Sequence, residues 1–367
     1  MPQVHTNRPP ERQTDRPYIK PLAKRSGIGA GKILALLTVV LLLSLTVLIG
    51  MVAALRSRVA AREAAIASLE SQVAEQKLQL SLAAVEATVA PIEEPKIHHA
   101  TPGADIRQIT DIDSGYAILI DMDKNEIVAS KNGDTRIYPA SMTKVMTLIV
   151  AVEHLTDLTD TFTFDYTVTD PAYKAGASVA GFLAGETVPL LDVLYGAALP
   201  SGADATTALA LTVGGTEEVF AELMNKKAEE IGLTETHFMN ASGLHHADHY
   251  STPHEMAIIM EYAMEIPLLR TILGTYQYTT TATEQHPEGL LLTSTMYSRM
   301  YGDEAGNSEV IAGKTGYTPE AGQCLASVAK TPDGREFVLV TASAVGKYAP
   351  IYDAIDIYKN YIPTLEN

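Results

Sequence analysis

The sequence predicts an α+β domain that follows a single N-terminal membrane helix. Strand-like runs occur at both ends of the domain, and the segment between them is mostly helical in pattern. At the start, residues 116–121 and 126–129 lie on either side of a short turn, which is typical of a hairpin. Near the end, three more strands are expected, at residues 310–314, 324–330 and 336–342. An antiparallel sheet with helices from both ends of the chain is an α+β fold.

Several helices are expected between the two groups of strands. Residues 141–152 and 188–199 are apolar on nearly every side, which predicts burial. Thr216 is expected to cap a helix over residues 217–231, and Thr252-Pro253 to open another. The inward face of the helix after Thr216 is predicted to hold Val219, Phe220, Leu223 and Met224.

Composition and charge exclude several classes of protein. The 367 residues include 46% hydrophobic and 19% charged residues, which is a globular composition. The single cysteine, Cys324, excludes an intramolecular disulfide framework and a cysteine-based zinc cluster. The formal net charge is −17, yet residues 1–32 hold seven Lys or Arg against Glu11 and Asp15. The rest of the chain is strongly acidic, and this argues against a nucleic-acid partner, which needs a basic face.

Residues 33–55 are predicted to form a transmembrane helix. They contain no charged residue and exceed the roughly 20 residues that cross a bilayer. A cleavable signal peptide has a shorter apolar core, of about 7–15 residues. Because the basic residues precede the span, residues 1–32 are expected to form a cytoplasmic tail. The rest of the chain is then expected outside the cytoplasm, attached to the cell membrane by one pass.

Three segments are predicted after the span. Residues 56–85 are expected to form a helical stalk, residues 86–107 a proline-containing linker, and residues 108–367 the folded domain. Apolar residues recur every seven positions in the stalk, as in a coiled coil, and a homodimer through this seam and a single exposed helix are equally compatible with the pattern. The first seam position is occupied by Val59, Ile66, Val73 and Leu80. Leu69 and Ala83 occupy the second seam position, which Arg62 and Gln76 interrupt.

Ser141 and Lys144 lie on the first turn of the apolar helix at residues 141–152. Side chains at i and i+3 share one face of a helix. A hydroxyl and an amine at the mouth of a buried helix form a nucleophile–base pair. Burial also favours the neutral amine, which is the form that accepts a proton. The four-residue pattern is common by itself, so its interpretation depends on the segments that follow.

Two further motifs follow in order, Ser201-Gly202-Ala203 and Lys314-Thr315-Gly316. Together with Ser141-x-x-Lys144 they resemble the penicilloyl-serine enzymes, a group that includes the penicillin-binding proteins and the serine β-lactamases. The linking sequence is similar to one branch, the serine D-alanyl-D-alanine carboxypeptidases, which are low-molecular-mass penicillin-binding proteins. The resemblance covers about residues 108–345. It rests on residues 220–228, Ile231-Gly232-Leu233, Thr236, Phe238, Gly243-Leu244, residues 249–252 and residues 312–318.

The resemblance implies a β-lactamase/transpeptidase-like domain, with helices on the faces of an antiparallel sheet and a helical subdomain. It implies that Ser141 attacks the carbonyl of the penultimate D-alanine and forms an acyl-enzyme. Lys144 would take the hydroxyl proton, and Ser201 would pass a proton to the leaving D-alanine. β-Lactams would be trapped on the same serine.

The resemblance also implies roles for the third motif. Lys314 and Thr315 would hold the terminal carboxylate of the substrate, and the charge of Lys314 would keep Lys144 neutral. The backbone N–H groups of Ser141 and Tyr317 would form the oxyanion hole, in which one donor is often worth about 3–4 kcal/mol.

Position 203 departs from the pattern of the family, which usually has asparagine there. That asparagine normally bonds the catalytic lysine and the backbone of the substrate, whereas this chain has Ala203 followed by Asp204. Loss of a charge-assisted hydrogen bond costs about 1.5–3 kcal/mol, or roughly ten- to a hundredfold in rate. Reduced activity or altered specificity is therefore expected, while the nucleophile and both lysines remain.

The function expected from these residues is that of a membrane-anchored serine D-Ala-D-Ala carboxypeptidase acting on peptidoglycan pentapeptides. A serine β-lactamase or esterase on the same fold is an alternative, and a cell-wall-binding pseudoenzyme is another that Ala203 permits. No cofactor and no metal are expected. His245, His246, His249, His254 and Asp248 are close together in sequence, but their spacing matches no common zinc pattern.

Overall fold

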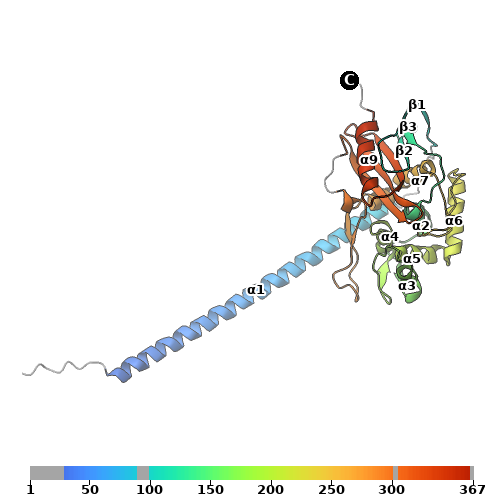
Figure 1. Cartoon of the computed structure of the whole chain (residues 1–367). Helices are drawn as coiled ribbons and strands as arrows, with labels where there is room; N and C mark the ends of the chain where they lie inside the picture. The colour runs from blue at the N-terminus through green and yellow to red at the C-terminus, as the bar shows by residue number, and fades with distance from the viewer. Residues whose placement is uncertain (1–28, 89–98, 301–304, 364–367) are drawn as a thin grey trace, which may run out of the picture. The chain divides into compact units, whose positions relative to one another are not determined.

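The computed structural model describes residues 29–88, 99–300 and 305–363 (Figure 1). The chain divides into two compact units, residues 1–81 and residues 82–367. Most of the basic tail predicted at residues 1–32 therefore lies outside the described residues. The described residues of the first unit form a helix from Ala30 onward, and the second unit contains the sheet, its covering helices and the predicted motifs.

One continuous helix, α1 (Ala30–Thr88), contains both the predicted membrane span and the predicted stalk. Its segment Gly31–Leu69 is long and apolar enough to cross a membrane, and none of the most apolar part is buried against other residues. The chain thus carries an N-terminal helix suited to membrane anchoring. Val59, Ile66 and Leu69 of the predicted seam are exposed. The side chains of the later seam positions lie outside the described residues, and a dimer through the seam stays a prediction.

The second unit is built on a six-stranded sheet with the order β1-β3-β2-β10-β9-β8. All neighbouring pairs are antiparallel except β1 and β3, which are parallel. The hairpin and the three late strands predicted from the sequence are confirmed, and the late strands extend further than expected. The bounds are β1 Thr101–Gln108, β2 Tyr116–Asp121, β3 Glu126–Lys131, β8 Glu309–Thr318, β9 Gly322–Lys330 and β10 Glu336–Ala344.

The sheet separates two apolar cores. The closing helix α9 (Ala349–Tyr361) covers one face (Figure 1). Leu119 and Leu339 belong to the apolar core on this face. On the other face, Ile118 and Val340 pack with the helices of the middle of the chain. Successive strand residues point to opposite faces, so a strand that is covered on both sides is apolar throughout. This explains why β2 and β10 are continuous apolar runs in the sequence.

The prediction that the linker extends to residue 107 is wrong. Residues 101–108 form β1, and the folded unit therefore includes residues before 108. The side chains of β1 are mostly exposed, so the strand has no apolar pattern that sequence reasoning detects. Backbone pairing with β3 and the Arg107 guanidinium, which donates to the carbonyls of Asn360 and Tyr361, hold β1 in place.

The helical middle contains the expected helices and several short elements that were not expected. The predicted caps are confirmed, since the Thr216 side chain accepts from the N–H of Val219 and that of Thr252 from the N–H of Glu255. Val219 is 43% exposed, so its predicted inward position is wrong, whereas Phe220 and Met224 are buried. The helices are η1 Ala140–Thr143, α2 Lys144–His154, α3 Tyr166–Lys174, α4 Leu190–Ala198, α5 Ala203–Gly214, α6 Glu217–Glu230, α7 Pro253–Glu265, α8 Pro267–Leu273 and η2 Tyr297–Arg299. The short hairpins are β4 Thr161–Thr163 with β5 Thr187–Pro189, and β6 Gln277–Thr279 with β7 Leu291–Thr293.

The pairing of β1 with β3 predicts the proper N-terminal limit of the folded domain. A chain that begins at residue 109 lacks β1 and leaves the backbone groups of the β3 edge unpaired. We expect its melting temperature to be at least about 3 °C below that of a chain that begins at residue 99, because 1 kcal/mol shifts it by roughly 2–4 °C at this size. Calorimetry on the two truncated chains measures the difference. Equal melting temperatures would show that β1 is dispensable.

Candidate active site

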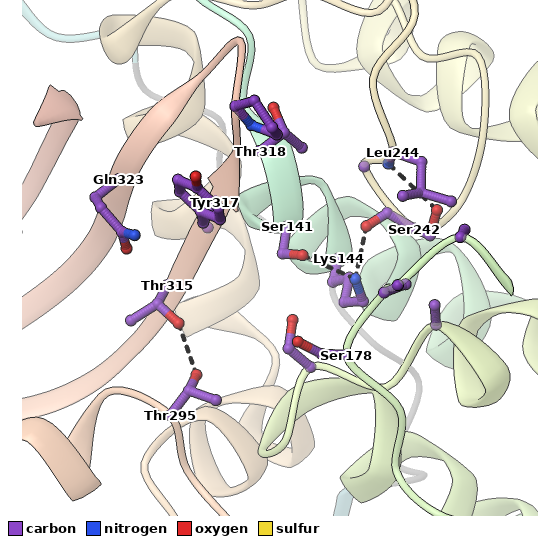
Figure 2. A pocket seen from close by; sticks show the side chains of 18 of the residues that line it. Ser141, Lys144, Ser178, Ser242, Leu244, Thr295, Thr315, Tyr317, Thr318 and Gln323 are labelled. Carbon is purple, nitrogen blue, oxygen red and sulfur yellow. Dashed lines mark hydrogen bonds between the residues drawn. The ribbon is translucent and has the colours of Figure 1, made fainter. Parts of the chain in front are cut away.

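Ser141 and Lys144 meet at the start of the buried helix, as the sequence predicts. Ser141 lies in the 3₁₀ turn η1, and Lys144 is the first residue of α2. Because a 3₁₀ turn has about three residues per turn, positions i and i+3 lie one above the other. Lys144 Nζ donates to Ser141 Oγ at 3.0 Å and to the carbonyl of Ser242 at 2.6 Å (Figure 2). The amine is thus within proton-transfer distance of the hydroxyl.

Burial tunes Lys144 for the role of a base. Its side chain is 2% exposed, and desolvation lowers its pKa to about 7. The nearby charge of Asp204 acts in the opposite direction but is the smaller effect. A substantial fraction of Lys144 is therefore neutral near neutral pH. The main cause is burial, rather than the charge repulsion by Lys314 that the family resemblance implied.

Ser201 and Lys314 form a second pair beside the first. Lys314 Nζ donates to Ser201 Oγ at 2.8 Å and to the carbonyl of Thr315 at 3.0 Å. Lys314 is 1% exposed, and its pKa is well below its usual value because of burial and then the charges of Lys144 and Arg299. Ser201 has a φ of +66°, a strained conformation for a residue with a side chain, and such residues concentrate at functional sites.

The predicted site residues border a cavity of about 670 Å³. Ser141, Lys144, Ser201, Thr315 and Tyr317 line this cavity. The Lys314 side chain is buried beside it, where it bonds Ser201. Three segments that are far apart in the sequence therefore meet in one groove, which is the arrangement that the three motifs predict. A hydroxyl nucleophile with its base and a second hydroxyl–amine pair are together suited to acyl transfer.

Two glycines permit this close approach of the segments. A Cβ on Gly316 would lie 3.0 Å from the backbone nitrogen of Ser141 and 3.0 Å from the carbonyl of Pro139. A Cβ on Gly243 would lie 1.9 Å from the carbonyl of Ala140, and the φ of Gly243 is +79°. Side chains at either position would push the β8 edge or the Ser242 loop away from the nucleophile.

Position 203 contributes only a methyl group to the cavity wall. Asp204 does not replace the missing amide side chain, since its carboxylate accepts from the backbone N–H groups of Ala180 and Gly181 at 2.7 and 3.1 Å. The nitrogen of Lys144 instead has the carbonyl of Ser242 as its second partner.

Several cavity residues were not identified from the sequence. Thr295 bonds the Thr315 hydroxyl at 2.6 Å, and two cationic side chains, Arg299 and Lys347, also line the cavity. Arg299 donates to the carbonyl of Lys347 at 3.4 Å, so the two residues lie side by side. These residues belong to no short motif. The one sequence feature that could have indicated Arg299 and Lys347 is their positive charge in a strongly acidic part of the chain.

His249, from the predicted histidine cluster, is a structural residue beside the site. Its Nε2 lies 2.8 Å from Thr143 Oγ1, and its Nδ1 accepts from the N–H of Met239 at 3.2 Å. Burial lowers its pKa to about 3, so it is neutral at physiological pH. His249 thereby joins the segment that supplies the Ser242 carbonyl to the turn that carries Ser141.

The fold is the one shared by solved DD-peptidases of the penicillin-binding protein class. The sequence profile of the S11 peptidases, described as D-alanyl-D-alanine carboxypeptidase, matches residues 101–345. The chain therefore belongs to the S11 peptidase family.

Two curated relatives illustrate the sequence similarity. D-alanyl-D-alanine carboxypeptidase DacF of Bacillus subtilis is 33% identical over 232 residues, which is 63% of this chain and 58% of the relative. D-alanyl-D-alanine carboxypeptidase DacA of Escherichia coli is 31% identical over 236 residues, which is 62% of this chain and 55% of the relative. The chain thus matches little more than half of the length of these relatives.

Solved structures share the architecture. A serine-to-alanine mutant of the Streptomyces K15 DD-transpeptidase superposes with a TM-score of 0.63 at 27% identity, covering 68% of this chain and 99% of its own. The D-alanyl-D-alanine carboxypeptidase of Mycobacterium tuberculosis gives a TM-score of 0.60 at 27% identity, covering 70% of this chain and 93% of its own.

The lowered pKa of Lys144 predicts how the reactivity of Ser141 depends on pH. Only the neutral amine accepts the hydroxyl proton, so the acylation rate should rise as the pH increases through about 7 and level off above it. Labelling rates with a fluorescent penicillin between about pH 5 and pH 9 measure this, with Ser141→Ala as the background at each pH. A rate that rises only near the ordinary lysine pKa would show that Lys144 is not the base.

Proposed function

We propose that this protein is a serine D-Ala-D-Ala carboxypeptidase that removes the terminal D-alanine from peptidoglycan stem peptides. The observation that carries the proposal is the contact of 3.0 Å between Ser141 Oγ and the buried amine of Lys144. Family membership and the D-alanyl-D-alanine carboxypeptidase names of the curated relatives support the substrate.

In the first step, neutral Lys144 accepts the hydroxyl proton of Ser141 across that contact. Ser141 Oγ then bonds to the carbonyl carbon of the penultimate D-alanine. The resulting oxyanion is held by the backbone N–H groups of Ser141 and Tyr317, which lie on η1 and on the β8 edge that packs against it. Fixed backbone donors of this kind stabilise the charge as it develops.

The peptide bond breaks when its nitrogen receives a proton. Ser201 relays to that nitrogen the proton that Lys144 accepted from Ser141, so Ser201 ends as a hydroxyl and Lys144 is neutral again. The Ser201 hydroxyl lies on the cavity wall and is held by Lys314. Free D-alanine leaves, and the peptide remains as an ester on Ser141. Water then attacks the ester carbonyl with Lys144 as the base, which releases the shortened peptide and restores the hydroxyl.

Positive charge on the cavity wall suits the terminal carboxylate of the substrate. Thr315 provides a hydroxyl on this wall, and Arg299 and Lys347 provide two neighbouring cations. A carboxylate is an acceptor only, so cationic donors and hydroxyls are its natural partners. This arrangement favours a peptide with a free C-terminus over an internal peptide bond.

Release of D-alanine by the full chain in detergent tests the proposal. An acylated L-Lys-D-Ala-D-Ala tripeptide should yield D-alanine, and Ser141→Ala and Lys144→Ala should each lower the rate by at least about a thousandfold. A fluorescent penicillin should label the wild type stably. Rapid loss of the label would favour a β-lactamase or esterase, and no label with no D-alanine release would favour a pseudoenzyme that binds the cell wall.

We also propose that the folded domain lies outside the cytoplasm, because basic residues precede the apolar segment of α1. Protease added to intact spheroplasts should then digest the folded domain and leave an N-terminal epitope tag protected. Lysed cells serve as the control in which both are digested. Digestion of the tag in intact spheroplasts would reverse the orientation.

A further inference from the structure

We propose that the Ser178 hydroxyl holds the backbone amide of the substrate in place of the side chain that Ala203 lacks. The inference rests on the proposed function and assigns a positioning residue to the same site. Ser178 lies in the loop after α3, which enters none of the three sequence motifs.

The backbone of Ser178 is hydrogen-bonded to that of Ala203, the position at which the asparagine side chain is missing. Its carbonyl accepts from the N–H of Ala203 at 2.8 Å. Immediately after it, the N–H groups of Ala180 and Gly181 donate to the carboxylate of Asp204. The two segments are therefore joined by three hydrogen bonds within a few residues of each other.

Gly202 shows how close this contact is. A Cβ at position 202 would lie 2.6 Å from the nitrogen of Ala180 and 2.8 Å from the Ala180 Cβ. Only glycine allows the two backbones to approach this far. The start of α5 and the Ser178 loop consequently act as one rigid wall of the cavity.

Ser178 borders the same cavity as the reacting groups. Figure 2 shows it below Ser141 and Lys144 in that view. Like an amide side chain, a hydroxyl can donate and accept a hydrogen bond. The methyl group of Ala203 leaves the space beside it open to a substrate.

The other hydroxyls of serine and threonine on the cavity wall already have partners. Ser242 donates to Asn240 Oδ1, while Thr295 bonds Thr315. Thr318 accepts from the N–H of Ala321, and Ser141 and Ser201 bond the two lysines. Among the described residues, the Ser178 hydroxyl alone of this set has no hydrogen-bond partner. It is therefore available to a peptide in the groove.

Two penicillins separate this role from a general effect on reactivity. Benzylpenicillin carries an acylamino group that resembles the backbone amide of a stem peptide, and 6-aminopenicillanic acid has a free amine instead. Both present the same lactam to Ser141. A group that binds the acylamino side chain should affect the first compound and not the second.

The experiment measures acylation rate constants for the full chain in detergent with both compounds. We expect Ser178→Ala to lower the acylation rate constant of benzylpenicillin about tenfold and to change that of 6-aminopenicillanic acid by less than about twofold. Ala203→Asn should restore the benzylpenicillin rate in the Ser178→Ala background and add little to the wild type. Thr169→Ala removes an exposed hydroxyl from α3 in the same segment and should leave both rates unchanged.

Different outcomes contradict different proposals. If Ser178→Ala slows both compounds equally or neither, or if Ala203→Asn has the same effect in both backgrounds, Ser178 does not have this role. The wild type would still be acylated in that case, and the carboxypeptidase proposal would be unaffected. A wild type that neither compound acylates overturns the proposed function and this inference together.

Discussion

The structure depends on one amine that is taken out of water and, within the described part of the chain, has no carboxylate bonded to it. Lys144 is buried, and the partners of its nitrogen there are a hydroxyl and a backbone carbonyl. Lowering its pKa from 10.5 to about 7 corresponds to about 5 kcal/mol against protonation. An amine with this pKa is partly neutral at neutral pH and can accept a proton. The rest of the domain must keep the amine buried for this to hold.

The sheet and its two cores maintain that burial. Helix α2 is buried along most of its length, so the turn that precedes it cannot move away from the helical core. The β8 edge and the Ser242 loop close over the turn from two other directions, and Gly316 and Gly243 allow them to touch it. The strain at Ala140 and Ser201, both at positive φ, is offset by this packing.

The sequence predicts the elements whose formation requires a particular type of side chain. Long apolar runs gave the central strands, and Thr216 and Thr252 marked helix starts, because capping needs a side-chain oxygen. Strands of three residues, such as β4 and β6, are too short to show a period. β1 is held by backbone pairing and by Arg107, and neither of these produces an apolar pattern in the sequence.

The same distinction applies to the site. The meeting of Ser141, Lys144, Ser201 and Lys314 at one groove was predictable, because the proposed nucleophile, base and proton relay require these residue types at fixed spacing within a turn or strand. Arg299, Lys347 and Ser178 reach the cavity only through tertiary contacts, and no local pattern distinguishes them from surface residues. A motif thus specifies the reacting groups, whereas tertiary packing specifies the other residues that line the cavity. For this reason an alanine within a motif does not by itself deprive the cavity of a polar group. The start of α5 is hydrogen-bonded to a second segment, and either segment can present a polar group to the same part of the cavity.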